Sequence, residues 1–572
     1  MCRPSCLLWE ASLDAIVFGA TGFVGRSLVA ELLRRGQRVA AAVRNDTLTP
    51  WLTAQGVGTD RLAVVTADIT RPLAGLPEAR VVYNSAARYA FGLGVDEARA
   101  VNVTGALNVL DWAATLPEPR RLVHISGYRV SAAEVGPDPA ASGAYEASKR
   151  EADLAVRARA RELGVPLNIA NPSTVIGPGQ YVGLATLVRQ LWHGRLPALP
   201  GGPDTFLPVV TVGHLARFLA ELPHAPTGEH HWVLDDATPP LPELIGTVAD
   251  HLGVRAPRRT IPVGLVRRLP RALTGADPET LHFLSTDRYP TASADAFAAG
   301  VGLEQPPVAD ALRAWADDLV AAGFGAGSPW SAAYGFRAVA GSRTWVTGDR
   351  HRPEHVLLHG LPMNADLWAP LAAHLPGPVL APDLPGLGRS SPTDRPTHAW
   401  LAELLDEVRT RPTLVAHSLA CGPALRLAVE RPERVGELVL VSPAFLQPPS
   451  PRLVRSRLAA VRLRGMSAAR LADTLGLPAG PAVASAAADL RRPGVARRVV
   501  AALRAAHGRR AEFRALLDRV AVPVRIVVGA ADPLVVPVEH EVLEVAGAGH
   551  YPQLTHPAEV AGLVTRAPSG SP

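Results

Sequence analysis

Residues 14–25 read DAIVFGATGFVG, and this stretch decides the fold of the first half of the chain. An apolar run that is typical of a buried strand leads directly into three glycines and the start of a helical pattern. Glycines allow a tight turn and let the backbone approach a pyrophosphate, whose charge then lies at the N-terminus of the following helix. The candidate dinucleotide-binding residues of this loop are Gly19, Thr21, Gly22, Phe23, Val24 and Gly25.

Strands and helices alternate along the chain beyond this loop. The pattern predicts strands at 39–43, 62–66, 81–84, 122–126 and 167–171, and helices at 25–35, 101–115 and 308–320. Such alternation implies a parallel sheet with helices on both faces. We therefore predict a Rossmann-type, doubly wound α/β domain over residues 13–322. A Gly-, Ser- and Pro-rich linker is expected over 323–333.

Arg44 ends the second predicted strand, about 20 residues after the glycines, where dinucleotide-binding domains distinguish NAD from NADP. A carboxylate at this point suits the ribose 2′-hydroxyl of NAD, whereas an arginine suits the 2′-phosphate of NADP. Arg44 therefore favours NADP, and the nearby Asp46 leaves NAD possible. Asp68, after the third predicted strand, has two open interpretations: it caps a loop, or it accepts a hydrogen bond from the adenine amine.

Lys149 is the single lysine of the chain; the other 57 of the 58 basic residues are arginine. It follows Tyr145 by four residues, so the two side chains would share one face of a helix. A nearby ammonium favours the phenolate, so we expect Lys149 to lower the pKa of Tyr145. Tyr145 would then act as general acid or base at a carbonyl or carbinol beside a nicotinamide.

Together these motifs resemble the extended short-chain dehydrogenase/reductase family, including its epimerase/dehydratase branch, over about residues 13–320. The resemblance implies that Ala86, in the motif at 84–87, borders the cofactor and that Asn102 is the family asparagine. The sequence departs from the family at Gly127, where a catalytic serine or threonine is expected. Either Ser126 or Ser131 supplies the missing hydroxyl, or the site is impaired.

A second α/β pattern follows the linker. Strands are expected at 356–359, 378–381, 413–416, 438–441 and 524–528, with a mostly helical insertion over about 447–518. This pattern predicts a second α/β domain over residues 334–566, in which the insertion forms a cap.

Ser418 lies at the expected turn between a strand and a helix, with Ala416 and Ala420 where glycines are usual. A nucleophile on such a turn needs small neighbours, and alanine is the smallest substitute. Asp532 and His550 follow in the order acid then base. His550 would accept the proton of Ser418, and Asp532 would orient the imidazolium that forms. The backbone N–H groups of the candidate oxyanion hole belong to Leu361 and Leu419.

With the HGLP sequence at 359–362 and the DLPGLGRSS sequence at 383–391, these residues resemble the α/β-hydrolase family over about 335–565. The resemblance implies hydrolysis of an ester, thioester or amide. A hydrolase-shaped domain without activity is the alternative, because of the two alanines beside Ser418.

The insertion is strongly basic. From Arg452 to Arg519 it holds fifteen arginines and four acidic residues, a net charge of +11, whereas the whole chain carries +6. One interpretation is a cap that attracts an anionic acyl substrate, such as a coenzyme A or carrier-protein thioester, or an anionic membrane surface. The other is a set of solvated helix faces in an arginine-biased chain.

The composition excludes several classes of protein. The chain has 572 residues, 48% of them hydrophobic, and its net charge is too small to argue for nucleic acid. Three cysteines favour a reducing cytoplasm, no segment reads as a transmembrane helix, and His and Cys show no metal-ligand spacing. The oligomeric state is left open.

The sequence predicts a bifunctional cytoplasmic enzyme, an NADP-dependent oxidoreductase joined to a serine esterase or thioesterase that acts on a hydrophobic acyl compound or secondary metabolite. Two alternatives concern the first domain: an epimerase or dehydratase, or a redox-sensing NADP-binding protein with little turnover.

Overall fold

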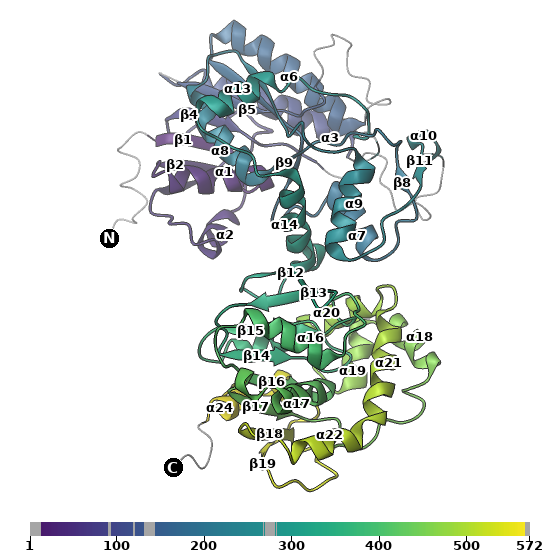
Figure 1. Ribbon diagram of the computed structural model, residues 1–572. Coiled ribbons are helices and arrows are strands. Elements are labelled where there is room, and N and C mark those ends of the chain that lie inside the picture. Colours follow the sequence, from purple (N-terminus) through teal and green to yellow (C-terminus); the bar gives the residue numbers. More distant parts are fainter. Residues whose placement is uncertain are drawn as a thin grey trace, which may run out of the picture. The chain divides into compact units, whose positions relative to one another are not determined.

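The computed structural model describes residues 13–89, 93–117, 120–130, 143–266, 268, 281 and 283–566 (Figure 1). The chain divides into two compact units, the first formed mainly by residues up to 315 and the second mainly by residues from 316 onward. Each unit is built around one large sheet.

The first unit holds a seven-stranded sheet in the order β10-β6-β5-β4-β1-β2-β3, and every neighbouring pair is parallel. β10 is an edge strand that the sequence pattern did not predict. The strands are β1 Leu13–Phe18, β2 Val39–Val43, β3 Leu62–Thr66, β4 Ala79–Asn84, β5 Arg121–Ile125, β6 Leu167–Pro172 and β10 His230–Val233.

Alternate side chains of β1 enter two different cores, which is what a sheet covered on both faces requires. Ala15 and Val17 pack in the core that includes residues of α1 and α8, whereas Ile16 and Phe18 pack in the core of α4 and α6. The helices that lie wholly or partly in this unit are α1 Phe23–Arg34, α2 Leu48–Ala54, α3 Val95–Arg99, α4 Gly105–Ala113, α6 Ala144–Leu163, α7 Leu184–Trp192, α8 Val212–Glu221, α9 Leu241–Leu252, α10 Val263–Val266, α13 Ala292–Gly300 and α14 Val308–Ala321.

The second unit holds an eight-stranded sheet in the order β12-β13-β15-β14-β16-β17-β18-β19. β12 and β13 form an antiparallel hairpin at one edge, and the strands from β15 to β19 are parallel. The hairpin and β19 were not predicted from the sequence. The strands are β12 Tyr334–Val339, β13 Ser342–Gly348, β14 His355–Leu358, β15 Val379–Pro382, β16 Thr413–His417, β17 Glu437–Val441, β18 Val524–Gly529 and β19 Glu541–Val545.

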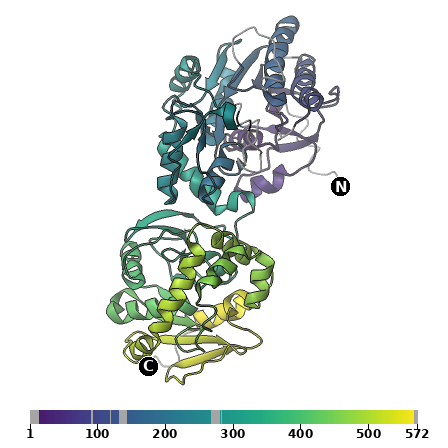
Figure 2. The same cartoon turned by 90° about the vertical axis from the view of Figure 1, so that its right-hand side faces the viewer.

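Five helices fill the segment between β17 and β18 and form the helical cap of this domain (Figure 2). They are α18 Arg457–Gly465, α19 Ala468–Leu475, α20 Pro481–Leu490, α21 Val495–Gly508 and α22 Arg510–Leu517. The other helices of the unit are α15 Ala369–Ala372, α16 Thr397–Leu404, α17 Cys421–Glu430, α23 Pro552–Thr555 and α24 Pro557–Thr565.

Candidate active sites

Ser418 is the first residue of a sharp 3-10 turn, Ser418–Ala420, that connects β16 to α17 in the second unit. Its φ is +54°, a left-handed conformation that a side-chain-bearing residue adopts only when its surroundings enforce it. Ala416 and Ala420 are both buried on either side. The turn thus has the backbone expected of a nucleophile elbow, with alanines in place of the usual glycines.

Ser418, His550 and Asp532 form one hydrogen-bonded chain. The Nε2 atom of His550 lies 3.0 Å from the Oγ atom of Ser418, and its Nδ1 atom lies 2.7 Å from Oδ2 of Asp532. Asp532 follows β18, and His550 follows β19 by five residues. The geometry matches that of a serine nucleophile, a general base and a carboxylate that orients the base.

Two further side chains support the hydrogen-bonded series of Ser418, His550 and Asp532. The sequence motifs did not predict a role for either of them. Gln447 donates its amide N–H to Oδ2 of Asp532, and this glutamine is buried. His417 shares a hydrogen bond of 2.8 Å between its Nε2 atom and the carbonyl oxygen of His550. Burial lowers the pKa of His417 well below its usual value, so the ring is neutral and acts as donor.

The loop after β14 packs against the elbow. A Cβ atom built on Gly360 would lie 2.8 Å from Cβ of Ser418, so only glycine allows this approach. His359 is buried and accepts the N–H of Leu384 at Nε2, 2.9 Å away, so it orients the loop. Leu361, the residue after Gly360, accepts the hydroxyl of Tyr551 at its carbonyl oxygen, 2.9 Å away.

In the glycine loop of the first unit, neighbouring backbone atoms leave no room for side chains at Gly19 and Gly25. Gly19 has a φ of +77°, and a Cβ atom there would lie 2.6 Å from the backbone nitrogen of Ala86. A Cβ atom on Gly25 would lie 2.1 Å from the carbonyl oxygen of Gly19. α1 begins at Phe23 without a side-chain cap, which leaves its first N–H groups available to an anion. The loop fits a dinucleotide pyrophosphate.

The acidic residues beside this loop have partners of their own. Asp46 accepts the backbone N–H groups of Leu48 and Thr49 at 3.1 and 3.0 Å, at the start of α2. Asp68 accepts the hydroxyl and the N–H of Thr70, and these hydrogen bonds lower the pKa of its carboxyl. Of the two interpretations of Asp68, loop capping is the one these bonds support.

Basic side chains are present on the same side of the domain. Arg44 is exposed directly after β2. Arg26, in the first turns of α1, places its guanidinium carbon 4.8 Å from the ring centre of Trp51. Arg26 was not among the predicted cofactor-binding residues. Its position directly after Gly25, the last glycine of the loop, is a signal that could have predicted it.

Lys149 is buried and donates a hydrogen bond of 2.8 Å to the carbonyl oxygen of Ile125, at the end of β5. Burial lowers the pKa of its ammonium to about 8. The expected effect on Tyr145 was wrong. Burial, followed by the neighbouring Tyr89, raises the pKa of Tyr145, so loss of solvation outweighs any stabilisation of the phenolate.

Tyr145 belongs to a cluster of aromatic rings that the sequence did not reveal. Its ring centre lies 4.9 Å from that of Tyr89 and 6.4 Å from that of Phe283. Tyr128 joins the cluster through Phe283, at 6.5 Å, and through Tyr289, at 5.0 Å. The rings come from segments that follow β4 and β5 and from residues 283–289. They surround the phenol with apolar surface.

Ser126 and Gly127 follow β5. Ser126 is buried beside the carboxyl of Asp153, whose pKa is raised by burial. Asp153 is two turns of α6 beyond Tyr145. A Cβ atom on Gly127 would meet no atom within 4 Å, so this position has room for a side chain. Ser131 lies outside the described residues.

Asn102 connects two segments of the candidate oxidoreductase site, the loop after β4 and helix α6. It lies in the π-helical turn η2 Ala100–Thr104, before α4. Its Oδ1 atom accepts the N–H of Arg88 at 2.7 Å, and its Nδ2 atom donates to Oγ of Ser148 at 2.8 Å. The asparagine therefore ties the loop after β4 to the turn of α6 that carries Lys149.

Comparison with known proteins agrees with the division of the chain into two units. Residues 356–563 match the model of the alpha/beta hydrolase family. The pimeloyl-[acyl-carrier protein] methyl ester esterase of Aromatoleum aromaticum is 32% identical over 244 residues, which cover 37% of this chain and 97% of the relative. The chain belongs to the alpha/beta hydrolase family. Its second unit is the hydrolase domain.

Residues 17–219 match the family model described as male sterility protein, a nicotinamide-dinucleotide-binding domain. Sterol demethylase protein B of Methylococcus capsulatus is 29% identical over 243 residues, which cover 38% of this chain and 70% of the relative. The terminal R domain from the myxalamid PKS-NRPS biosynthetic pathway is 23% identical with a TM-score of 0.45, covering 55% of this chain and 92% of that chain. The chain is an enzyme in which an oxidoreductase part is fused to a hydrolase part.

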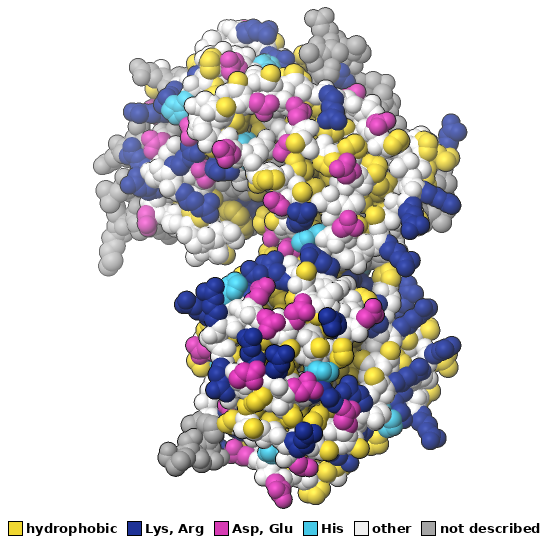
Figure 3. Space-filling view, in the orientation of Figure 1, with side chains coloured by type: hydrophobic (Ala, Val, Ile, Leu, Met, Phe, Trp, Pro, Cys, Tyr) yellow, Lys and Arg dark blue, Asp and Glu magenta, His cyan; other side chains and the backbone are white. Residues whose placement is uncertain are grey.

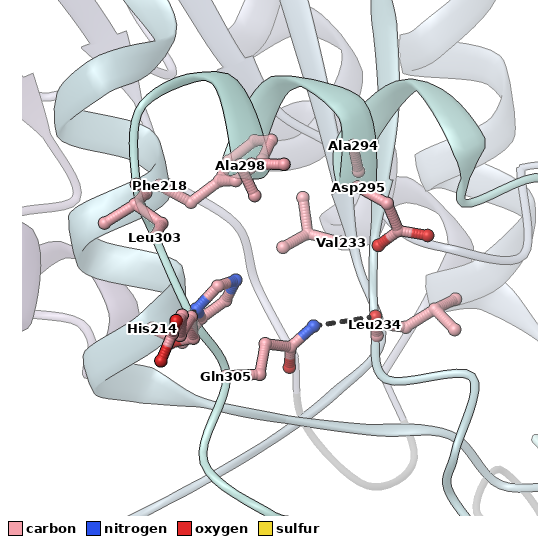
Figure 4. A pocket seen from close by; sticks show the side chains of 12 residues that line it. His214, Phe218, Val233, Leu234, Ala294, Asp295, Ala298, Leu303 and Gln305 are labelled. Carbon is pink, nitrogen blue, oxygen red and sulfur yellow. Dashed lines mark hydrogen bonds between the residues drawn. The ribbon is translucent and has the colours of Figure 1, made fainter.

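The oxidoreductase part also contains a cavity of about 410 Å³ between α8, β10 and α13 (Figure 4). Phe218, Val233 and Leu303 line it, and Gln305 donates to the carbonyl oxygen of Leu234 at its rim. None of the candidate residues of either site lines this cavity. Within the described part of the chain, no helix has the length and apolar character that a membrane crossing requires.

Proposed function

We propose that the hydrolase domain is a serine esterase or thioesterase in which Ser418, His550 and Asp532 are the catalytic residues. The observation that carries the proposal is the continuous hydrogen-bonded chain from Ser418 through His550 to Asp532, beside a nucleophile with a φ of +54°. Chance packing of three polar side chains rarely yields both features together.

The proposed reaction follows from the positions of these atoms. Nε2 of His550 removes the proton from Oγ of Ser418 as Oγ attacks the acyl carbonyl carbon. The N–H groups of Leu361 and Leu419 stabilise the oxygen that becomes negative, and Asp532 stabilises the imidazolium. His550 then protonates the leaving alcohol or thiol, and water releases the acyl group by the same route.

The substrate is proposed to be an acyl ester or thioester of a hydrophobic acid. The basic cap segment, with a net charge of +11, supports an anionic carrier such as coenzyme A or a carrier protein. The pimeloyl-[acyl-carrier protein] methyl ester esterase, whose length is 97% covered, supports the same substrate class.

A chain-length series of acyl esters and acyl-coenzyme A thioesters tests this proposal. Mixing the protein with an activated ester should add the acyl mass to Ser418, as intact-mass spectrometry and peptide mapping can detect. The Ser418→Ala variant should gain no mass. Turnover that is equal in the parent and in Ser418→Ala on every substrate would refute the proposal.

We propose further that the first domain is an NADP-dependent oxidoreductase. The glycine loop and the open N-terminus of α1 would hold the pyrophosphate, with Ala86 at its border. Arg44 and Arg26 would hold the 2′-phosphate, since Asp46 is engaged at the start of α2. The bound nicotinamide would exchange a hydride with the substrate.

The proposed roles of the protein groups follow from their surroundings. Tyr145 is protonated at neutral pH because its pKa is raised, so it would donate a proton to a carbonyl oxygen during reduction. Lys149, held by the carbonyl of Ile125, would place a positive charge near that oxygen. The aromatic cluster would exclude water and accept a hydrophobic carbonyl compound.

Titrations of the protein with NADPH and NADH, followed by nucleotide fluorescence, test the cofactor preference. NADPH should bind more tightly, and Arg44→Ser should reduce the difference. Equal affinities in the parent would contradict the assignment of NADP.

One observation favours a second function for this domain. Gly127 occupies the position where the family places a hydroxyl, so the domain would bind NADP with little turnover. The two proposals differ in NADPH consumption: an oxidoreductase consumes it with a carbonyl substrate and loses this activity in Tyr145→Phe, whereas a sensor shows only binding.

A further inference from the structure

Aliphatic side chains project from the cap at and before α18. Leu453, Leu458 and Val461 are 72%, 73% and 73% exposed. Such exposure is unusual for large aliphatic residues when they gather at one place. The α18 patch consists of these three residues with Val454, Arg452, Arg457, Arg462 and Arg464.

The sequence of α18 places its aliphatic side chains between arginines on the outward face of the helix. At 100° per residue, Val461 and Leu458 lie at the middle of the outward face. Arg457 and Arg464 flank them on one side, and Arg462 flanks them on the other. Ala460, on the opposite face, is buried, so the helix holds its place in the cap by that face.

The patch is positively charged without any counter-charge in its own segment. No acidic residue occurs between Glu437 and Asp473, and this stretch contains six arginines. The ion pairs found among the described residues include none of the four patch arginines. In Figure 3, arginine and apolar side chains gather along the side of the hydrolase domain where Figure 1 places α18 and α21.

The chemistry of the patch indicates the kind of partner. The centres of protein interfaces are enriched in aromatic side chains, and the patch has none. Two serines near the patch, Ser456 and Ser467, use their hydroxyl oxygens to cap the N-termini of α18 and α19. Aliphatic residues flanked by arginines need only an apolar interior and an anionic surface, which a negatively charged lipid bilayer provides.

We propose that the α18 patch docks the enzyme on an anionic lipid surface. The aliphatic side chains enter the boundary between headgroups and acyl chains, while the arginines contact lipid phosphates. The patch lies on the helical cap of the hydrolase domain, so docking brings this domain to substrates dissolved in the bilayer. The binding itself does not depend on the proposed hydrolase activity.

Sedimentation of the full chain with vesicles tests the proposal. Vesicles of phosphatidylcholine are compared with vesicles of phosphatidylcholine and phosphatidylglycerol in a 3:1 ratio at low and moderate salt. The double variant Leu458→Asp/Val461→Asp should bind the anionic vesicles at least about tenfold more weakly. Removal of Arg462 or Arg464 by substitution with Gln should weaken binding by about fivefold for each charge.

Leu154→Asp is the matched control, because Leu154 is an exposed leucine, 50% accessible, on α6 of the other domain. It should bind like the parent, and thermal unfolding should show that all variants are folded. Binding to anionic vesicles alone, weakened by salt and by the patch variants, supports the proposal. Equal binding by parent and patch variants overturns it, as does binding to an acidic acyl carrier protein without any binding to vesicles.

Discussion

The two candidate active sites are built in different ways. In the hydrolase domain, Ser418, His550 and Asp532 already contact one another through hydrogen bonds of 3.0 and 2.7 Å. In the oxidoreductase domain, Lys149 is bonded to a backbone carbonyl, and Tyr145 is surrounded by aromatic rings. A site made of protein groups alone satisfies its polar atoms internally. A site that uses a dinucleotide depends on a ligand to complete its polar surface.

The comparison predicts that the hydrolase site is most sensitive to loss of its internal contacts. Asp532→Asn should lower kcat for ester hydrolysis by about 10⁴-fold, because His550 loses the carboxylate that orients it and stabilises its charge. Steady-state kinetics with a short-chain ester measures this, with unchanged thermal unfolding as the control. A loss below about tenfold would remove Asp532 from the catalytic residues.

The oxidoreductase site, in contrast, should gain from an added contact. Gly127→Ser should raise NADPH-dependent turnover by up to about 100-fold, since the position has space for a side chain and a hydroxyl is otherwise lacking there. Gly246→Ser is the control, because a Cβ atom at this glycine of the same domain also meets no atom within 4 Å. An unchanged rate in Gly127→Ser would show that the missing hydroxyl is not limiting.

Gln447 has a positioning role in the hydrolase site, because it donates a hydrogen bond to Asp532 and is not proposed to contact the substrate. Gln447→Leu should lower kcat by about tenfold through loss of a hydrogen bond to a charged group, with little change in KM. The kcat–pH profile should also move, since the carboxylate that faces His550 becomes less well held. A change in KM alone would contradict this positioning role.

The smallest predicted effect concerns pH and the oxidoreductase domain alone. Burial lowers the pKa of Lys149 to about 8, so its ammonium is present below that pH and is lost above it. NADPH-dependent turnover should therefore fall by about fivefold between pH 8 and pH 9. Hydrolysis should not follow the same curve, since Lys149 lies in the other domain. A rate that stays constant to pH 10 would exclude a role for the ammonium.

Local sequence patterns predicted much of this arrangement. The parallel strands from β1 to β6 and from β14 to β18 have apolar runs bounded by glycines or polar turns, and each was expected near its observed place. The strands β10, β12, β13 and β19 were missed because their sequences, HHWV, YGFRAV, SRTWVTG and EVLEV, mix polar with apolar residues and lack the continuous apolar run of a doubly covered strand.

Residues that act through tertiary contacts were harder to predict. Gln447 reaches Asp532 across 85 positions of sequence, and the rings around Tyr145 come from segments up to 194 positions apart. The pKa of Tyr145 was misjudged for the same reason: helix spacing placed Lys149 on the same face, but only the folded structure shows how strongly the phenol is buried.

One crossed experiment tests most directly whether the chain holds two independent active sites. Ester hydrolysis and NADPH consumption are measured on the same preparations of the parent, Ser418→Ala and Tyr145→Phe. We expect Ser418→Ala to lose hydrolysis and keep NADPH consumption, and Tyr145→Phe to show the reverse. If either substitution abolished both activities in a folded protein, or neither abolished its own, the account of two separate sites would be contradicted.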